Sequence, residues 1–218
     1  MVIGDTERDL RMHHFYSLQN HTLGIALFFE ARLAEIEERT NDAALIYMDQ
    51  VRFGHALERG GDLNDFHISY QNKSDASDNL RRIADCLNAP TCRNIIHQLE
   101  ELELRREPTS EILKRNKEID RREKGFQFQE KVSRMLRTRS LDPYKAVRIE
   151  LEMASNHQRR QALITMLTLA RHAYTLEHGN KPDDASSLVP SYLSAIPQDP
   201  FTHKNLNFAD RSSWGWHD

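Results

Sequence analysis

The chain has 218 residues, which is enough for one domain with a buried core and too few for two domains of full size. Its 30 basic and 33 acidic residues give a net charge of -3, so the whole molecule has no strong field that would attract nucleic acid or an anionic membrane. Hydrophobic residues make up 39% and charged residues 29%, a balance typical of a helical protein with long solvated faces.

The N-terminal part of the chain shows apolar residues at steps of three and four, and alternating patterns of strand length are almost missing. This periodicity predicts an all-α fold, a multi-helix array with helical hairpins. We expect helices over 10–18 and 23–36, the second ending before Thr40, a good N-cap residue type. A third helix over 44–55 should end at Gly60, where glycine readily adopts a left-handed cap.

The middle of the chain begins with a polar segment, 62–78, in which we expect an irregular connection. Helical periodicity resumes at Leu80. Pro90 is expected to end that helix and Thr91 to cap the next one. A long charged stretch follows over 110–139.

The C-terminal part has the clearest helix start, with Asp142 as the expected N-cap and Pro143 at the first helical position. The helix should end at Gly179, and the prolines beyond it predict an extended tail. We therefore expect a helical domain over 1–178 and a short Pro-containing tail over 179–218, docked on the last helix. The residues expected to make the docking contacts are Tyr174, Leu188, Val189, Tyr192, Leu193 and Phe201.

A recognisable pattern covers residues 159–208. It begins with a helix that ends between a Tyr and a His-Gly pair, and the motifs Leu-Val-Pro-x-Tyr-Leu and Asp-Pro-Phe follow. The matching residues are Tyr174, His178, Gly179, Pro182, Leu188, Val189, Pro190, Tyr192, Leu193, Pro197, Asp199, Pro200, Phe201, Lys204, Leu206 and Phe208. The pattern resembles the end of planctomycete-type bacterial helical proteins, a segment that is similar to the end of type II secretion pseudopilins. The resemblance implies a bacterial, membrane-associated envelope system, and it implies no particular activity.

The sequence departs from the pseudopilin pattern in its N-terminal part and in its tail. It shows no prepilin cleavage site, and its early apolar run, 23–29, is far shorter than the roughly 20 residues that cross a bilayer. His203 replaces the usual tail glycine, and no acidic Ca²⁺ loop follows Phe208. We expect a cytoplasmic protein as written, or an extracytoplasmic, membrane-anchored one if an upstream anchor has been removed. Membrane association would depend on that anchor.

No arrangement of residues gives a catalytic or metal-binding signature. The 11 histidines include no His-Glu-x-x-His motif, and two cysteines cannot form a structural zinc site. We therefore expect no catalytic residue, no metal and no cofactor. Cys86 and Cys92 are either reduced thiols on neighbouring helices or a disulfide across the turn at Pro90.

One charged stretch, 114–148, contains twelve Lys or Arg against five Asp or Glu. It can be interpreted as a surface for the phosphates of anionic lipid or nucleic acid. The alternative is a solvated helix that faces acidic residues, because charge runs on helices usually serve solubility. Nucleic acid is not the expected partner. The candidate anion-binding residues are Lys114, Arg121, Arg122, Lys124, Lys131, Arg134, Arg137 and Arg139.

Taken together, these features predict a non-enzymatic helical scaffold or interaction protein with protein partners, in a membrane-associated envelope system. One alternative is an enzyme whose site is assembled from residues distant in sequence. The other is a binder of anionic lipid or nucleic acid through 114–148.

Overall fold

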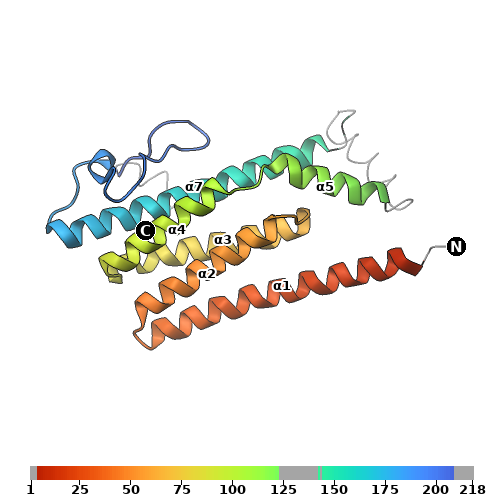
Figure 1. Ribbon diagram of the computed structural model, residues 1–218, viewed down its shortest axis with the longest axis horizontal. Helices are drawn as coiled ribbons and strands as arrows, with labels where there is room; N and C mark the ends of the chain where they lie inside the picture. Colours follow the sequence, from red (N-terminus) through yellow and green to blue (C-terminus); the bar gives the residue numbers. More distant parts are fainter. Residues whose placement is uncertain (1–3, 123–141, 143, 209–218) are drawn as a thin grey trace.

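The computed structural model describes residues 4–122, 142 and 144–208 and shows an all-α multi-helix array, which confirms the predicted fold class (Figure 1). No described helix is both long enough and apolar enough to span a membrane. The described α-helices are α1 (Gly4–Ile36), α2 (Thr40–Glu58), α3 (Leu63–Ile83), α4 (Ala89–Leu104), α5 (Thr109–Arg122) and α7 (Lys145–His178). Short 3-10 turns follow α3 at Ala84–Cys86 and lie in the tail at Ala185–Leu188.

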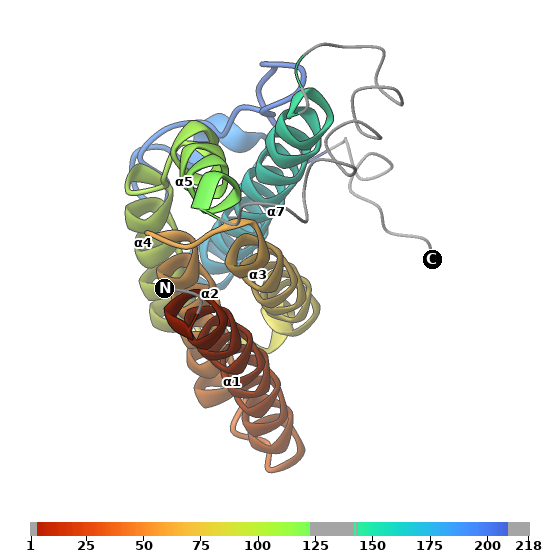
Figure 2. The ribbon, with the colours of Figure 1, turned by 90° about the vertical axis from the view of Figure 1, so that its right-hand side faces the viewer.

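The helices are arranged in successive layers (Figures 1 and 2). Helix α1 lies at one edge and packs on α2, α2 pairs with α3, and α3 packs in turn on α7, which lies beside α4. The tail covers the opposite edge, next to α7. The main core lies between these layers, where Tyr47, Met48, Leu80, Ile95 and Leu167 are fully buried. Burial of such side chains is the main source of stability.

The segment 62–78 is helical, so the predicted irregular connection is wrong. The Asp62 carboxylate accepts the backbone N–H groups of Asn64 and Asp65 at 2.8 and 3.1 Å, and the Asp65 carboxylate accepts the N–H of Asp62 at 3.3 Å. This reciprocal capping box starts α3. Four polar residues of the segment are buried helical ones: Ser69, Asn72, Lys73 and Ser77.

The two helices expected over 10–18 and 23–36 form the single helix α1. The polar residues between them do not interrupt it, and the Thr22 hydroxyl donates to the Leu18 carbonyl of the preceding turn at 2.9 Å. Thr40 is the first residue of α2 and makes no side-chain cap, contrary to expectation.

Two further helix starts also differ from prediction. Pro90 lies in the first turn of α4 and does not end α3, because proline needs no N–H partner there. The cap of α4 is Asn88, whose side chain accepts the N–H of Thr91 at 2.8 Å. Helix α7 begins two residues later than expected, after Asp142 accepts the N–H of Tyr144 at 2.9 Å. Pro143 lies outside the described residues.

Two predicted helix ends are confirmed by left-handed glycines. Gly60 has a φ of 80° just beyond α2, and Gly179 has a φ of 75° at the end of α7. At the second end, the Gly179 N–H donates to the Thr175 carbonyl at 2.9 Å. Glycine adopts this conformation without a Cβ penalty, so these positions end their helices.

The first half of the tail packs on α4 and α7. Leu188, Tyr192 and Leu193 are buried in the main core cluster, with Val189 and Tyr174 partly buried beside them. Arg93 on α4 joins the elements, because its guanidinium donates to the Ser191 carbonyl at 2.8 Å and pairs with Glu177 of α7 at 2.6 Å. The Tyr192 hydroxyl donates to the same carboxylate at 2.6 Å.

Phe201 does not dock as expected, because its side chain is 45% exposed. The carboxylate of Asp199 accepts the N–H groups of Phe201 and Thr202 at 2.8 and 3.2 Å and turns the chain outward. The same carboxylate pairs with Arg160 of α7 at 3.0 Å. Asp199 therefore anchors this loop, and Phe201 lies at its outer side.

Candidate functional site

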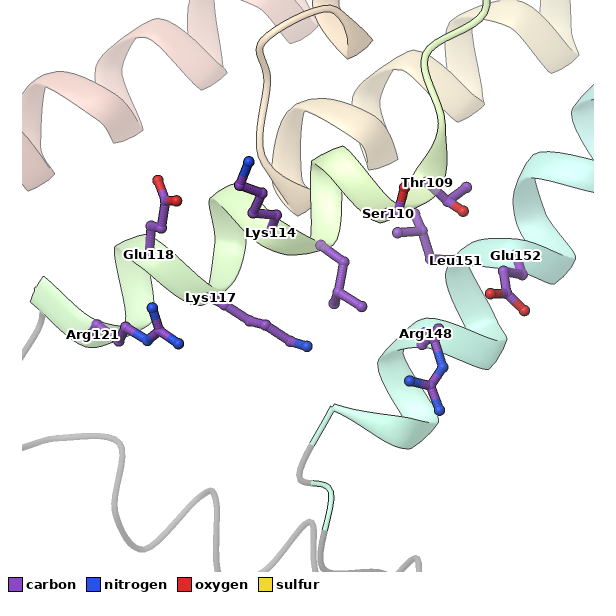
Figure 3. Close-up of a pocket in the computed structure, with 10 residues that line it drawn as sticks. Thr109, Ser110, Lys114, Lys117, Glu118, Arg121, Arg148, Leu151 and Glu152 are labelled. Atoms are coloured by element: carbon purple, nitrogen blue, oxygen red, sulfur yellow. The ribbon is translucent and has the colours of Figure 1, made fainter.

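Two of the candidate basic residues, Lys114 and Arg121, lie on α5 and line a pocket between α5 and the start of α7 (Figure 3). Lys117 and Arg148 complete its cationic lining, and the pocket has a volume of about 410 Å³. Arg122 ends α5. Its side chain lies outside the described part of the chain, as do the other candidates, Lys124, Lys131, Arg134, Arg137 and Arg139.

The charges around this α5–α7 pocket are largely compensated. The Lys114 ammonium lies 3.7 Å from the Glu111 carboxylate, and the Arg148 guanidinium lies 3.4 Å from that of Asp142. The Lys117 ammonium lies 5.0 Å from the centre of the Tyr144 ring, a cation–π distance. Two carboxylates, Glu118 and Glu152, also line the pocket. The pocket therefore has mixed charge, which weakens it as an anion site.

Helix α1 carries an unusual share of exposed apolar side chains. Of the thirteen large apolar side chains that are exposed in the described residues, seven lie on α1. Large contiguous apolar patches on soluble proteins usually mark interaction sites, whereas single exposed residues do not. The arrangement of the α1 residues decides between these two cases.

Five of these side chains form one stripe, which we call the outer stripe: Leu18, Ile25, Phe29, Leu33 and Ile36. They are 66%, 43%, 64%, 53% and 75% exposed. At 3.6 residues per turn they lie within roughly 80° of one another and span roughly 27 Å along the helix. The stripe is continuous except for Thr22, which occupies the same face. It is therefore a patch and not a scatter of single residues.

The opposite face of α1 carries small residues that pack on the bundle. Ala31 and Ala34 are fully buried. A Cβ on Gly24 would lie 2.1 Å from the Asn72 side-chain oxygen, so this position has no room for a side chain. An ordinary amphipathic helix points its large apolar residues at the core. Helix α1 packs Phe28 against the core but turns the five residues of the outer stripe away from it, so packing in the bundle does not explain that stripe.

A buried ion pair lies inside the bundle. The Lys73 ammonium on α3 lies 2.5 Å from the Glu58 carboxylate at the end of α2, and the Ser69 hydroxyl donates to the same oxygen at 2.9 Å. Lys73 is 8% and Glu58 is 3% exposed. Burial lowers the pKa of Lys73 to about 8, although the Glu58 charge opposes that shift.

Next to the ion pair lies a cavity of about 20 Å³ between α2, α3, α4 and α7. His55 and Gln158 line it, and their Nε2 atoms have no hydrogen-bond partner among the described residues. Burial lowers the pKa of His55, as do the nearby cations of Lys73 and Arg106. The cavity has room for a water molecule and not for a substrate. The titratable cluster is therefore an interior network that gives no support to an enzyme.

The remaining candidate sites are metal-ligating clusters and the two thiols. No cluster of metal-ligating side chains occurs in the described residues. Both thiols are free, with Cys86 exposed and Cys92 buried. Burial raises the pKa of Cys92 to about 12, which keeps it protonated and unreactive.

The sequence analysis missed the outer stripe, the ion pair and the cavity. The helical period was visible around Leu33 and Ile36, but it does not say which face is turned outward. Comparison with known proteins adds no relative: the chain matches no protein-family model, and it matches no curated protein and no solved structure at a significant level. Its function must therefore be inferred from its own geometry.

Proposed function

We propose that the chain is a non-catalytic helical interaction protein that self-associates through α1. The observation that carries this proposal is the exposed outer stripe on a helix whose small residues already face the bundle. Covering such a stripe removes apolar surface from water, at roughly 1.5–3 kcal/mol for each large side chain that becomes fully buried. The resemblance of residues 159–208 to pseudopilin ends supports an assembly role in an envelope system.

The partner we propose is a second copy of the chain, because the outer stripe is nearly symmetric about Leu27. When two α1 helices pair antiparallel with their centres aligned, Leu18 lies opposite Ile36, and Ile25 lies opposite Phe29. An interface of this kind uses the same patch on both subunits, which is the arrangement of most homodimers. From Leu18 the stripe follows steps of seven, four, four and three residues, eighteen residues in about five turns, which matches the 3.6-residue period of a straight helix.

The position of α1 leaves this face accessible. Figures 1 and 2 both show α1 at the edge of the molecule, opposite the tail, with no other described element beyond it. Its N-terminal part extends past the end of α2. Beside the stripe, Arg32 pairs with Glu35 at 2.9 Å, which supplies part of a polar rim. An apolar centre with a polar rim is the usual anatomy of a protein interface.

The proposal predicts that the chain is a dimer and that the double variant I25E/F29E is a monomer. At the centre of the antiparallel pair, this variant would place four carboxylates against one another. Sedimentation equilibrium measures the mass, and circular dichroism checks that the helices remain. The control is I149E/M153E on α7, which also adds two charges four residues apart at apolar side chains that are 46% and 60% exposed.

Three outcomes would contradict the proposal. The wild-type chain could be monomeric at concentrations of several hundred micromolar. The α7 control could dissociate as completely as the α1 variant, which would show that the interface is elsewhere or unspecific. The α1 variant could remain dimeric with unchanged affinity.

A further inference from the structure

A second hollow, of about 650 Å³, lies between the C-terminal half of α2 and the end of α4. Its volume falls within the usual range for small-ligand sites. Three arginines line it. Arg52 lies on α2, Arg59 directly follows α2, and Arg105 directly follows α4. All three are exposed, and His55 lies beside them. We call this site the arginine hollow.

Two of these arginines, Arg59 and Arg105, form no ion pair in the described residues, although the charge of Arg59 contributes to lowering the pKa of nearby Glu107. The one carboxylate that lines the hollow, Glu107, is already occupied, because Arg115 pairs with both of its oxygens at 2.7 Å. It also accepts the N–H of Gly60 at 3.3 Å. Arg52 pairs with Asp49 at 2.6 Å. Arg59 and Arg105 form no ion pair with any described residue, so their charge is available to a ligand.

His55 links the arginine hollow to the interior. It lines both the hollow and the 20 Å³ cavity, and its side chain is largely buried, with Nε2 lacking a partner among the described residues. Besides burial, the cations of Lys73, Arg106 and Arg59 lower the pKa of His55, and only Glu58 on the neighbouring turn raises it substantially. Lys73 and Arg106 are paired with Glu58 and Glu103, so Arg59 is the cation near His55 without an ion pair among the described residues.

We propose that the arginine hollow binds a small, multiply charged oxyanion, such as a phosphate or diphosphate group, between Arg59 and Arg105. A guanidinium offers planar, paired N–H donors that match two oxygens of such a group, and hydrogen bonds between charged partners are the strong ones. A bound anion would also add a negative charge close to His55.

A different role for the same arginines is to complement the partial negative charge at the C-terminal ends of α2 and α4. That role would affect helix stability, and it does not require the two side chains to face one hollow. The two roles differ in what they predict, because only an anion site responds to the identity and concentration of the ligand.

The test is calorimetric titration with inorganic pyrophosphate at pH 7.5 and low ionic strength. We expect the variant R59Q/R105Q to bind at least about tenfold more weakly than wild type, since each lost charged hydrogen bond has a large effect. The matched control is K181Q/K204Q in the tail, which removes the same number of charges at two exposed residues outside the hollow and should bind as wild type does. Thermal unfolding without ligand measures the effect on helix stability separately.

A second arm separates a free anion from a lipid headgroup. Sedimentation with vesicles that contain phosphatidic acid detects the headgroup, and pyrophosphate detects the soluble ligand. Binding in either arm that R59Q/R105Q loses and K181Q/K204Q keeps supports the proposal. No binding in either arm, no loss in R59Q/R105Q, or an equal loss in both variants overturns it.

A third readout reports on the position of the ligand. Sulfate does not titrate between pH 5 and 8, so it can stand in for phosphate while the imidazole of His55 is followed by NMR. An anion in the hollow favours the protonated ring, and the pKa of His55 should rise in sulfate relative to chloride at equal ionic strength. An unchanged pKa in saturating sulfate would place the anion elsewhere.

Discussion

Lys73 and Glu58 are charged groups in the interior of a helical bundle, where an ion loses most of its hydration. The cost of that desolvation is repaid only if the geometry of the pair is good and the remaining polar atoms are satisfied. Here the two charges lie 2.5 Å apart, and Ser69 adds a further hydrogen bond to the carboxylate. The pair therefore joins the end of α2 to α3 in the interior of the bundle.

At this scale we predict that removing one charge is far more harmful than removing both. Glu58→Gln should lower the free energy of unfolding by about 3–5 kcal/mol, because it leaves the Lys73 ammonium buried without a counterion. The double variant E58L/K73M should recover most of that loss, since it replaces the ion pair with apolar groups of similar size. Urea unfolding of the variants gives the free energies. Additive losses in the double variant would contradict this account.

Among the elements, α3 shows that a buried polar network removes the apolar period by which a helix is recognised in a sequence. Lys73 and Ser69 belong to the buried ion pair, and Asn72 accepts a hydrogen bond from Gln50 of α2 at 3.2 Å. Polar residues usually indicate a solvent-exposed surface or a loop. Because they occupy the buried face here, the segment 62–78 shows no helical period of apolar residues. The one local signal was Asp62 followed three residues later by Asp65, a carboxylate variant of the capping box.

That capping box gives a prediction for the element. Asp62→Ala removes the acceptor for two N–H groups at the start of α3 and should lower the free energy of unfolding by about 1 kcal/mol. Urea unfolding measures the difference. The control is Asp183→Ala, the same substitution at an exposed residue of the tail, which should change stability by less than about 0.5 kcal/mol. An equal effect in both variants would mean that the cap does not stabilise α3.

For the whole molecule, the all-α class and two helix ends could be predicted, because they depend on local signals. The helical period and the glycines at Gly60 and Gly179 act within one or two turns of the chain. The layer order and the sites depend on which face of a helix meets which neighbour. Sequence analysis could not place the outer stripe for that reason, since both faces of α1 are apolar. The arginine hollow was missed too, because Arg59 and Arg105 lie at the ends of two helices that are far apart in the sequence.

The proposed dimer should also govern the thermal stability of the whole molecule. If the paired species is the one that unfolds, the melting temperature rises with protein concentration by mass action. A tenfold increase adds about 0.7 kcal/mol per chain, or roughly 2 °C for a chain of this length. Differential scanning calorimetry over two decades of concentration measures this slope.

The variants described above distinguish the sources of such a slope. I25E/F29E should melt at a temperature that does not depend on concentration, because its outer stripes cannot pair. I149E/M153E should keep the slope of the wild type. A wild-type melting temperature that is constant over both decades would show that α1 is not held by a second copy when the protein unfolds. The apolar partner of the outer stripe would then have to be a different protein.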